Sequence, residues 1–135
     1  MILLRHAWAG SRDDWDGDDR DRPLDDRGRA QARNLVAILA PFRIDEILTS
    51  PYVRCVQTVE PLASARGLSP QLRVELGEDR QWDEGAALVR GLAGRDVVVC
   101  GHGGLDGVLA DAPKWKKGTA FVLDDDLRVV DVLRG

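Results

Sequence analysis

The chain has 135 residues, of which 44% are hydrophobic and 31% charged, and this composition predicts one globular domain over residues 1–135. The net charge of −4 argues against a nucleic acid polymer as the partner, because phosphate backbones bind basic surfaces. No apolar stretch has the length of a membrane span, and Arg5 interrupts the first one, so we expect neither membrane association nor a signal peptide.

The N-terminal part predicts a strand, a polar loop and a helix. Ile2–Leu4 is a continuous apolar run, which is typical of a strand buried on both faces of a sheet. Residues 10–23 are polar and rich in aspartate, which indicates a loop. Asp25 is a good N-cap for a helix that ends near Pro41. The apolar positions on one face of this helix are Ala32, Leu35, Val36 and Leu39.

A second strand and a second helix follow. The short strand is predicted over residues 44–49. Ser50 offers a capping hydroxyl and Pro51 suits the first turn, so a helix should begin there. We expect it to continue to about Ala65 and to stop at Gly67.

The C-terminal half continues the alternation of strands and helices. Expected strands are the alternating run 72–76 and a central strand over 96–100, with helices over 84–92 and 104–109 between and after them. The tail predicts a hairpin, with strands over 120–123 and 127–133 and a turn of three aspartates. The fold class is therefore three-layer α/β, a mostly parallel central sheet with helices on both faces and a C-terminal antiparallel hairpin at one edge.

Histidine occurs only twice, and each histidine directly follows a predicted buried strand. His6 follows the first strand, and His102 follows the central one within a glycine-rich segment. Ligands bind beyond the carboxyl ends of parallel strands, so both rings should meet at one edge of the sheet. Gly103 lets the backbone approach a ligand closely, and the helix expected after it would present free N–H groups to an anion.

Two arginines are expected at the same edge. Arg54 lies in the first turn of the predicted second helix and leans toward that edge, and Thr58, one turn on, could orient it. Arg5 adds a second guanidinium, although strict strand alternation would direct Arg5 and His6 to opposite faces. Histidines with guanidinium groups and close backbone suit a phosphate.

These residues resemble the histidine phosphatase superfamily, which includes the phosphoglycerate mutases. The matching motifs follow one another in the family's order along nearly the whole chain: Leu4-Arg5-His6, then Pro23-Leu24 with Gly28, Gln31 and Ala32, then Ser50-Pro51 with Arg54, Gln57 and Thr58, and finally Gly101-His102-Gly103. Ala7 stands where many members have glycine.

The resemblance implies a role for each site residue. His6 would attack the phosphoryl group and carry it, while Arg5, Arg54 and His102, with Gly103, would bind its oxygens. Cationic neighbours should lower the pKa of His6 and so favour the neutral nucleophile. A carboxyl group would protonate the leaving oxygen. Glu78 is the choice for that acid because it follows the predicted strand 72–76 in a loop, with Glu75 and Asp79 as alternatives.

The resemblance also suggests substrates. The chain lacks the long insertions of the mutases and is most similar to the small SixA-type phosphohistidine phosphatases. The segments 22–32 and 116–119 also resemble the phosphatase domain fused to some MutT-like Nudix hydrolases. The expected partner is thus a phosphorylated protein or a small phosphorylated molecule, a nucleotide or sugar phosphate included. The expected cofactor is none.

Other interpretations of the same residues are weaker. Two histidines and a carboxylate can bind zinc or iron, but two guanidinium groups would repel a cation, so we expect no metal. The aspartates of the loop 13–21 lack the final glutamate of a calcium loop and more often form a solvated surface near the site. A phosphate-binding module without turnover would need the same pocket but no catalytic acid.

The two cysteines, Cys55 and Cys100, have neither the spacing nor the neighbours of a metal site. We expect two free, mostly buried thiols in a reducing, cytoplasmic compartment. The sequence places no base beside Cys55, so its expected role is structural.

Overall fold

The computed structural model describes all residues from Met1 to Gly135 and contains one six-stranded sheet in the order β3-β2-β4-β1-β5-β6. The strands are β1 (Ile2–Arg5), β2 (Glu46–Thr49), β3 (Gln71–Leu72), β4 (Val97–Gly101), β5 (Thr119–Leu123) and β6 (Val129–Arg134). Strands β1 to β4 are mutually parallel, and β5 and β6 form an antiparallel hairpin at one edge. The predicted fold class is confirmed.

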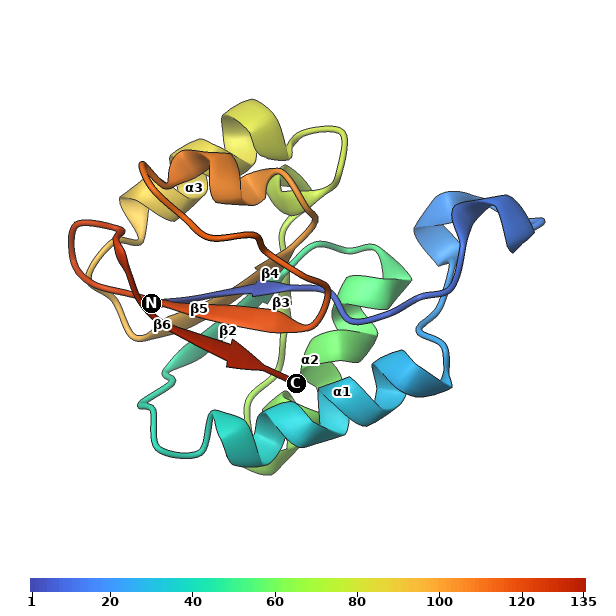
Figure 1. The fold of residues 1–135 in the computed structure, drawn as a ribbon, viewed down its shortest axis with the longest axis horizontal. Helices are drawn as coiled ribbons and strands as arrows, with labels where there is room; N and C mark the ends of the chain where they lie inside the picture. The colour runs from blue at the N-terminus through green and yellow to red at the C-terminus, as the bar shows by residue number, and fades with distance from the viewer.

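Helices cover both faces of this sheet (Figure 1). Helices α1 (Asp26–Ile38) and α2 (Val53–Arg66) lie together on one face, and the shorter α3 (Ala86–Gly91) lies on the other with the turn after β4. No helix is both long and apolar enough to cross a membrane.

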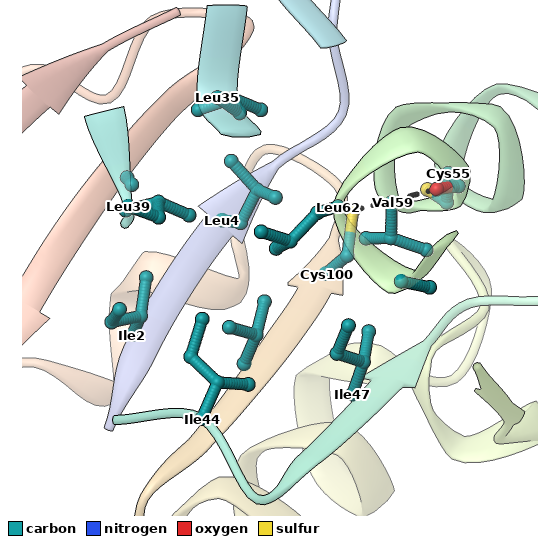
Figure 2. Close-up of a cluster of buried hydrophobic side chains, with 13 residues drawn as sticks. Ile2, Leu4, Leu35, Leu39, Ile44, Ile47, Cys55, Val59, Leu62 and Cys100 are labelled. Atoms are coloured by element: carbon teal, nitrogen blue, oxygen red, sulfur yellow. Dashed lines mark hydrogen bonds between the residues drawn. The ribbon is translucent and has the colours of Figure 1, made fainter. Parts of the chain in front are cut away.

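The central strands bury both of their faces, as their continuous apolar runs predicted. Alternate residues of β1 and β4 point to opposite sides, so Leu4 and Cys100 join the core beneath α1 and α2, while Leu3 and Val99 join the core beneath α3. Figure 2 shows the first of these cores, where Leu35, Leu39, Val59 and Leu62 of the helices meet the strands. Both cysteines are free and fully buried, as predicted.

Helix α1 begins where the sequence indicated and is held close to the chain that leaves β1. The Asp25 side chain accepts a hydrogen bond from the Gly28 N–H at 2.8 Å, and the Asp25 N–H donates to the Trp8 carbonyl at 3.1 Å. A Cβ atom on Gly28 would lie 1.9 Å from that carbonyl oxygen. Only glycine fits here, and the close approach fixes the segment after β1 against α1.

Three predicted elements differ from the structure. Of the predicted strand 72–76 only Leu72 pairs with β2, together with Gln71 before it, and residues 74–76 form a 3-10 turn in which Val74 is 52% exposed. Alternating apolar residues need a neighbouring layer to cover them, and at this edge only Leu76 is buried, while Leu72 and Val74 are exposed. A π-type turn at residues 81–85 replaces the first part of the predicted helix 84–92. The predicted helix 104–109 is a single 3-10 turn, Leu105–Val108.

The start of α2 also differs. The helix begins at Val53 after Tyr52, and no side chain caps it. Ser50 lies before this boundary, and its hydroxyl has another partner, described below. The predicted end is confirmed, because Gly67 adopts a left-handed conformation (φ 65°) that closes the last turn.

Candidate active site

His6 directly follows β1 and lies in the carboxyl-edge crevice of the sheet. Its N–H donates to the Gly101 carbonyl at 3.0 Å, which extends the β1–β4 pairing by one residue. The ring is 5% exposed, and its Nδ1 lies 2.7 Å from the Ala7 carbonyl oxygen. Because a carbonyl oxygen only accepts hydrogen bonds, Nδ1 carries the proton and Nε2 keeps its lone pair. The ring is therefore in the tautomer that a nucleophile requires.

The surroundings of His6 also keep it neutral. Burial lowers the pKa of His6 well below 6.5. The hydrogen bond to the Ala7 carbonyl opposes this shift, and the charges of Arg54 and Arg5 lower the pKa of His6 further. The predicted direction of this shift is confirmed, with burial as its largest cause.

His102 follows β4, and its ring meets that of His6 edge to face with 5.5 Å between the ring centroids. Its Nε2 lies 2.9 Å from the Ser50 hydroxyl, which itself accepts the Tyr52 N–H at 3.2 Å. That hydroxyl is free to donate its own proton to Nε2, and Nδ1 then carries the ring proton. Nδ1 has no hydrogen-bond partner, and the nearest carboxylate oxygen, on Glu78, is 4.0 Å away.

Arg54 is 1% exposed in the first turn of α2, where the sequence placed it. Two of its nitrogens donate to Asp19: Nη1 to the backbone carbonyl at 2.8 Å and Nη2 to the carboxylate at 3.1 Å. Nη2 also donates to Glu78 at 2.8 Å. Nε has no partner. The predicted contact with Thr58 is made by the backbone instead, because the Thr58 hydroxyl donates to the Arg54 carbonyl at 2.7 Å.

Glu78 lies in the loop after residues 74–76, and its carboxylate stands between Arg54 and His102. It also accepts two hydrogen bonds from Arg12, at 3.0 and 3.2 Å. Glu75, the first alternative, is paired with Arg73 at 2.5 Å and makes no contact with either histidine. Of the three candidate carboxyl groups, the structure brings Glu78 next to the histidine pair.

Arg5 is the site residue whose position differs most from the expected one. Its Nη1 donates to the Trp115 carbonyl at 2.6 Å, and a Cβ on Gly103 would lie 2.9 Å from its guanidinium carbon. It lines a cavity next to that of His6 and not the His6 cavity itself. Strand alternation explains this separation, because consecutive side chains of β1 point to opposite faces. The Nε of Arg5 is buried and has no partner.

The cavity that contains His6, here called the His6 cavity, has a volume of about 550 Å³. Its lining residues are His6, Trp8, Gly10, Ser11, Arg12, Arg22, Asp25, Arg54, Glu78 and Lys117. Three buried side-chain nitrogens in the protein lack a hydrogen-bond partner: Arg5 Nε, Arg54 Nε and His102 Nδ1. All three belong to residues that the sequence assigned to phosphate binding. Buried donors without partners are costly, so Arg54 Nε and His102 Nδ1 near His6, with Arg5 Nε in the adjoining cavity, indicate that this edge of the sheet binds anions.

Three further residues contact the site, although the sequence did not indicate that they belong to it. Ser50 was interpreted as a helix cap and instead contacts His102. Gln81 is buried, accepts the His102 N–H at 3.3 Å and donates to the Gly103 carbonyl at 2.9 Å. Asp19 of the aspartate-rich loop binds Arg54. A buried glutamine between exposed residues gives no sequence signal, because its partners lie about twenty positions away.

Two expectations about this region are wrong. The turn after Gly104 is too short to present helix N–H groups to an anion, and the Gly104 N–H is already bound to Asp106 at 3.0 Å. A base does lie near Cys55, because His102 Nε2 is 3.6 Å from its sulfur. No group of three or more His, Cys, Asp or Glu side chains is arranged to hold a metal ion.

Two histidines and a buried arginine at the carboxyl edge of a parallel sheet define an α/β protein with a candidate anion-binding site at that edge. Residues 1–86 match the model of the histidine phosphatase superfamily (branch 1), and the chain belongs to this family. An uncharacterised protein from Picosynechococcus sp. is 32% identical over 128 residues, which cover 90% of this chain and 73% of that protein.

A more similar but shorter match is to an 8-oxo-(d)GTP phosphatase from Mycolicibacterium smegmatis, 52% identical over 63 residues. These residues are 47% of this chain and only 20% of that protein, so the match spans a fifth of the relative's length.

Among solved structures, one assigned to the phosphohistidine phosphatase SixA from Agrobacterium tumefaciens has a TM-score of 0.79 and 26% identity. The superposition covers 99% of this chain and 96% of that one. A protein histidine phosphatase SixA complexed with tungstate also has a TM-score of 0.79, at 22% identity, over 98% of this chain and 95% of that one, and supports the fold alone.

Proposed function

We propose that this chain is a metal-independent phosphatase that works through a phosphohistidine intermediate on His6. The observation that carries this proposal is a pair of unpartnered buried donors, Arg54 Nε and His102 Nδ1, near a histidine whose Nε2 lone pair is free. Membership of the histidine phosphatase superfamily supports the same chemistry.

In the first step, His6 Nε2 forms a bond to the phosphorus as the bond to the leaving group breaks, a P–O bond in a phosphoester or a P–N bond in phosphohistidine. Arg54 and His102 donate to the phosphoryl oxygens, and the charge that develops on those oxygens strengthens these hydrogen bonds in the transition state. Arg5, whose guanidinium lies beside Gly103 and lines the adjoining cavity, contributes positive charge to the same region. The neutral state of His6 leaves its lone pair available at neutral pH.

Glu78 is the proposed acid for the leaving group. Its carboxylate lies between Arg54 and His102 and so occupies the position that a phosphoryl oxygen would need. A bound phosphate would take over the hydrogen bond from Arg54 and place its negative charge beside Glu78. That charge favours the protonated carboxyl group, which can then give its proton to the leaving oxygen. Afterwards the carboxylate can take a proton from the water that hydrolyses the phosphohistidine.

Two substrate classes fit this site. The likeness to a SixA structure at 26% identity favours phosphohistidine on a protein. The partial match to an 8-oxo-(d)GTP phosphatase favours a small phosphorylated molecule. Both classes use the same nucleophile and the same oxygen-binding groups.

The test is turnover of para-nitrophenyl phosphate by the wild type and by His6→Asn. We expect the variant to lose about a thousandfold or more in kcat/KM, because no other neutral nucleophile lies at this position. Added chelator should leave the wild-type rate unchanged. Quenching the reaction at alkaline pH should trap one phosphoryl group on the peptide that contains His6. Phosphate binding without any turnover would instead indicate a binding module, and loss of activity with chelator would indicate a metal enzyme.

A further inference from the structure

A second cavity, here called the basic cavity, lies next to the His6 cavity and has a volume of about 570 Å³. Six of its nine lining residues are cationic: Arg5, Arg27, Lys114, Lys116, Lys117 and Arg134. The other three are Trp8, Gln31 and Thr119, so no carboxylate lines this cavity. Positive charge is therefore concentrated in this cavity, although the whole protein has a net charge of −4.

None of these six cations forms an ion pair, although nine arginines elsewhere in the chain do. The nine paired arginines are Arg12, Arg20, Arg22, Arg29, Arg43, Arg54, Arg73, Arg80 and Arg95. The mutual repulsion of six unpaired cations lowers stability, and an anion with several charges would relieve it. One cation of the six, Arg5, also has a buried Nε without a hydrogen-bond partner.

The walls of the basic cavity are fixed by hydrogen bonds that do not use its cationic groups. Gln31 accepts the Trp8 N–H at 3.0 Å and donates to the Lys117 carbonyl at 3.2 Å. The Gly118 N–H donates to the carbonyls of Arg5 and His6, at 3.2 and 3.0 Å. These bonds tie the lysine-bearing segment to the end of β1. The backbone that carries Lys116 and Lys117 is thus fixed beside the end of β1 before any ligand binds.

The basic cavity adjoins the His6 cavity along two residues that line both, Trp8 and Lys117. The Trp8 ring lies between two cations, with the Arg27 guanidinium and the Lys117 ammonium each 4.3 Å from its centroid. Partial burial and the charges of Arg5, Arg22 and Arg54 lower the pKa of Lys117. Because Lys117 lines both cavities, it is within reach of ligands in either one.

We propose that the basic cavity binds a second phosphate of the same substrate, so that the preferred substrates are small organic diphosphates. This inference rests on the proposed function and specifies its substrate class. A concave site of this volume is typical of small ligands. A folded protein partner would instead need a contact surface of about 800 Å² on this side. The adjoining cavities place one phosphate at His6 and the other among the cations.

The reaction on such a substrate follows from the two positions. His6 Nε2 forms a bond to the terminal phosphorus, and the bond from that phosphorus to the bridging oxygen breaks. The electron pair stays on the bridging oxygen, and the leaving organic monophosphate is stabilised by the cations of the basic cavity. Water then adds to the phosphohistidine as the P–N bond breaks, Glu78 takes the proton of the water and passes it to solvent, and inorganic phosphate leaves.

The experiment compares ligands that carry one phosphate with ligands that carry two, in the wild type and in the double variant Lys116→Gln/Arg134→Gln. Both substituted residues are exposed and line only the basic cavity. Inorganic pyrophosphate should inhibit para-nitrophenyl phosphate hydrolysis with a Ki about tenfold or more below that of orthophosphate, because it reaches both cavities. In the double variant this advantage should fall to about threefold or less, with kcat/KM for para-nitrophenyl phosphate unchanged. Adenosine diphosphate should likewise be a better substrate than adenosine monophosphate in the wild type only.

The matched control is Arg90→Gln/Arg128→Gln, which removes the same charge from two exposed, unpaired arginines outside both cavities. In this control variant the Ki of pyrophosphate should stay as far below that of orthophosphate as in the wild type. Equal Ki values for pyrophosphate and orthophosphate in the wild type would overturn the proposal. So would a double variant that loses activity only on a phosphohistidine protein, since that result would assign the cations to an acidic protein.

The binding measurement separates this proposal from the proposed function. Calorimetry of the wild type with pyrophosphate and with orthophosphate needs no turnover. Tighter binding of pyrophosphate that the double variant loses would support the basic cavity even if no phosphoester were hydrolysed. If the protein hydrolyses para-nitrophenyl phosphate but binds pyrophosphate no more tightly than orthophosphate, the proposed phosphatase activity is supported and the second phosphate site is refuted.

Discussion

Replacing Ser50 by alanine tests whether His102 acts as an oriented donor to the substrate. The Ser50 hydroxyl is fully buried and contacts two groups, His102 Nε2 at 2.9 Å and the Tyr52 N–H at 3.2 Å. In Ser50→Ala the sulfur of Cys55, 3.6 Å away, is the only other polar contact of Nε2. The ring then loses the contact that sets its tautomer and directs Nδ1–H toward the phosphoryl oxygens.

The size of the effect follows from the cost of a buried group that loses its partner, about 1–3 kcal/mol. At about 1.4 kcal/mol per factor of ten, kcat/KM for para-nitrophenyl phosphate should fall between about 5-fold and about 100-fold. Vanadate resembles the transferring phosphoryl group, so its Ki should rise by a similar factor. The free energy of unfolding in urea should fall by about 1–3 kcal/mol.

The control is Ser64→Ala, which removes an exposed hydroxyl from α2, the helix that follows Ser50, and should change neither kcat/KM nor the unfolding free energy. A purely structural role for Ser50 would lower the unfolding free energy and leave the vanadate Ki of the folded enzyme as it was. That outcome, or a Ser50→Ala variant with wild-type kcat/KM, would refute the idea that Ser50 positions His102.

Three other predictions test the acid, the nucleophile and the packing beside the site. Glu78→Gln should lower kcat by about a hundredfold or more on alkyl phosphates but by far less on para-nitrophenyl phosphate, whose leaving group needs no proton; equal losses on both would argue against the acid. Because the pKa of His6 is lowered in the folded state, the unfolded chain binds more protons, and unfolding free energy should fall as pH drops below 6.5, by at most about 1.4 kcal/mol per pH unit from this group. Urea titrations at several pH values should show a shallower slope in His6→Asn, and identical slopes would contradict a buried neutral ring. Gly28→Ala places a Cβ 1.9 Å from the Trp8 carbonyl oxygen and should cost about 3 kcal/mol or more by urea unfolding, while Gly91→Ala, with open space around it, should cost little.

Much of the fold follows from features that are local in the chain. The continuous apolar runs of β1 and β4, the Asp25 cap and the left-handed Gly67 each act within a few residues, and each was predicted correctly. The predicted strand 72–76 failed because its alternating pattern requires a layer of side chains to cover it. Leu72 and Val74 are 57% and 52% exposed at the sheet edge instead.

In the candidate site, too, some residues could be predicted from local sequence features and others could not. The sequence by itself indicated His6, His102 and Arg54, because each follows a predictable strand end or helix start at the carboxyl edge of a parallel sheet. It also indicated the neutral state of His6, since cations beside a histidine lower its pKa.

Only the tertiary structure decided which groups these residues contact. The Ser50 hydroxyl meets a ring 52 positions away, and Gln81 bridges His102 and Gly103. Strand alternation placed Arg5 in the basic cavity, where it joins lysines that are more than a hundred positions away in the chain. Local propensity determines where strands and helices begin and end, but hydrogen bonds and charge clusters depend on the packing of distant segments. That packing brings together a histidine pair and a group of cations that are far apart in the sequence.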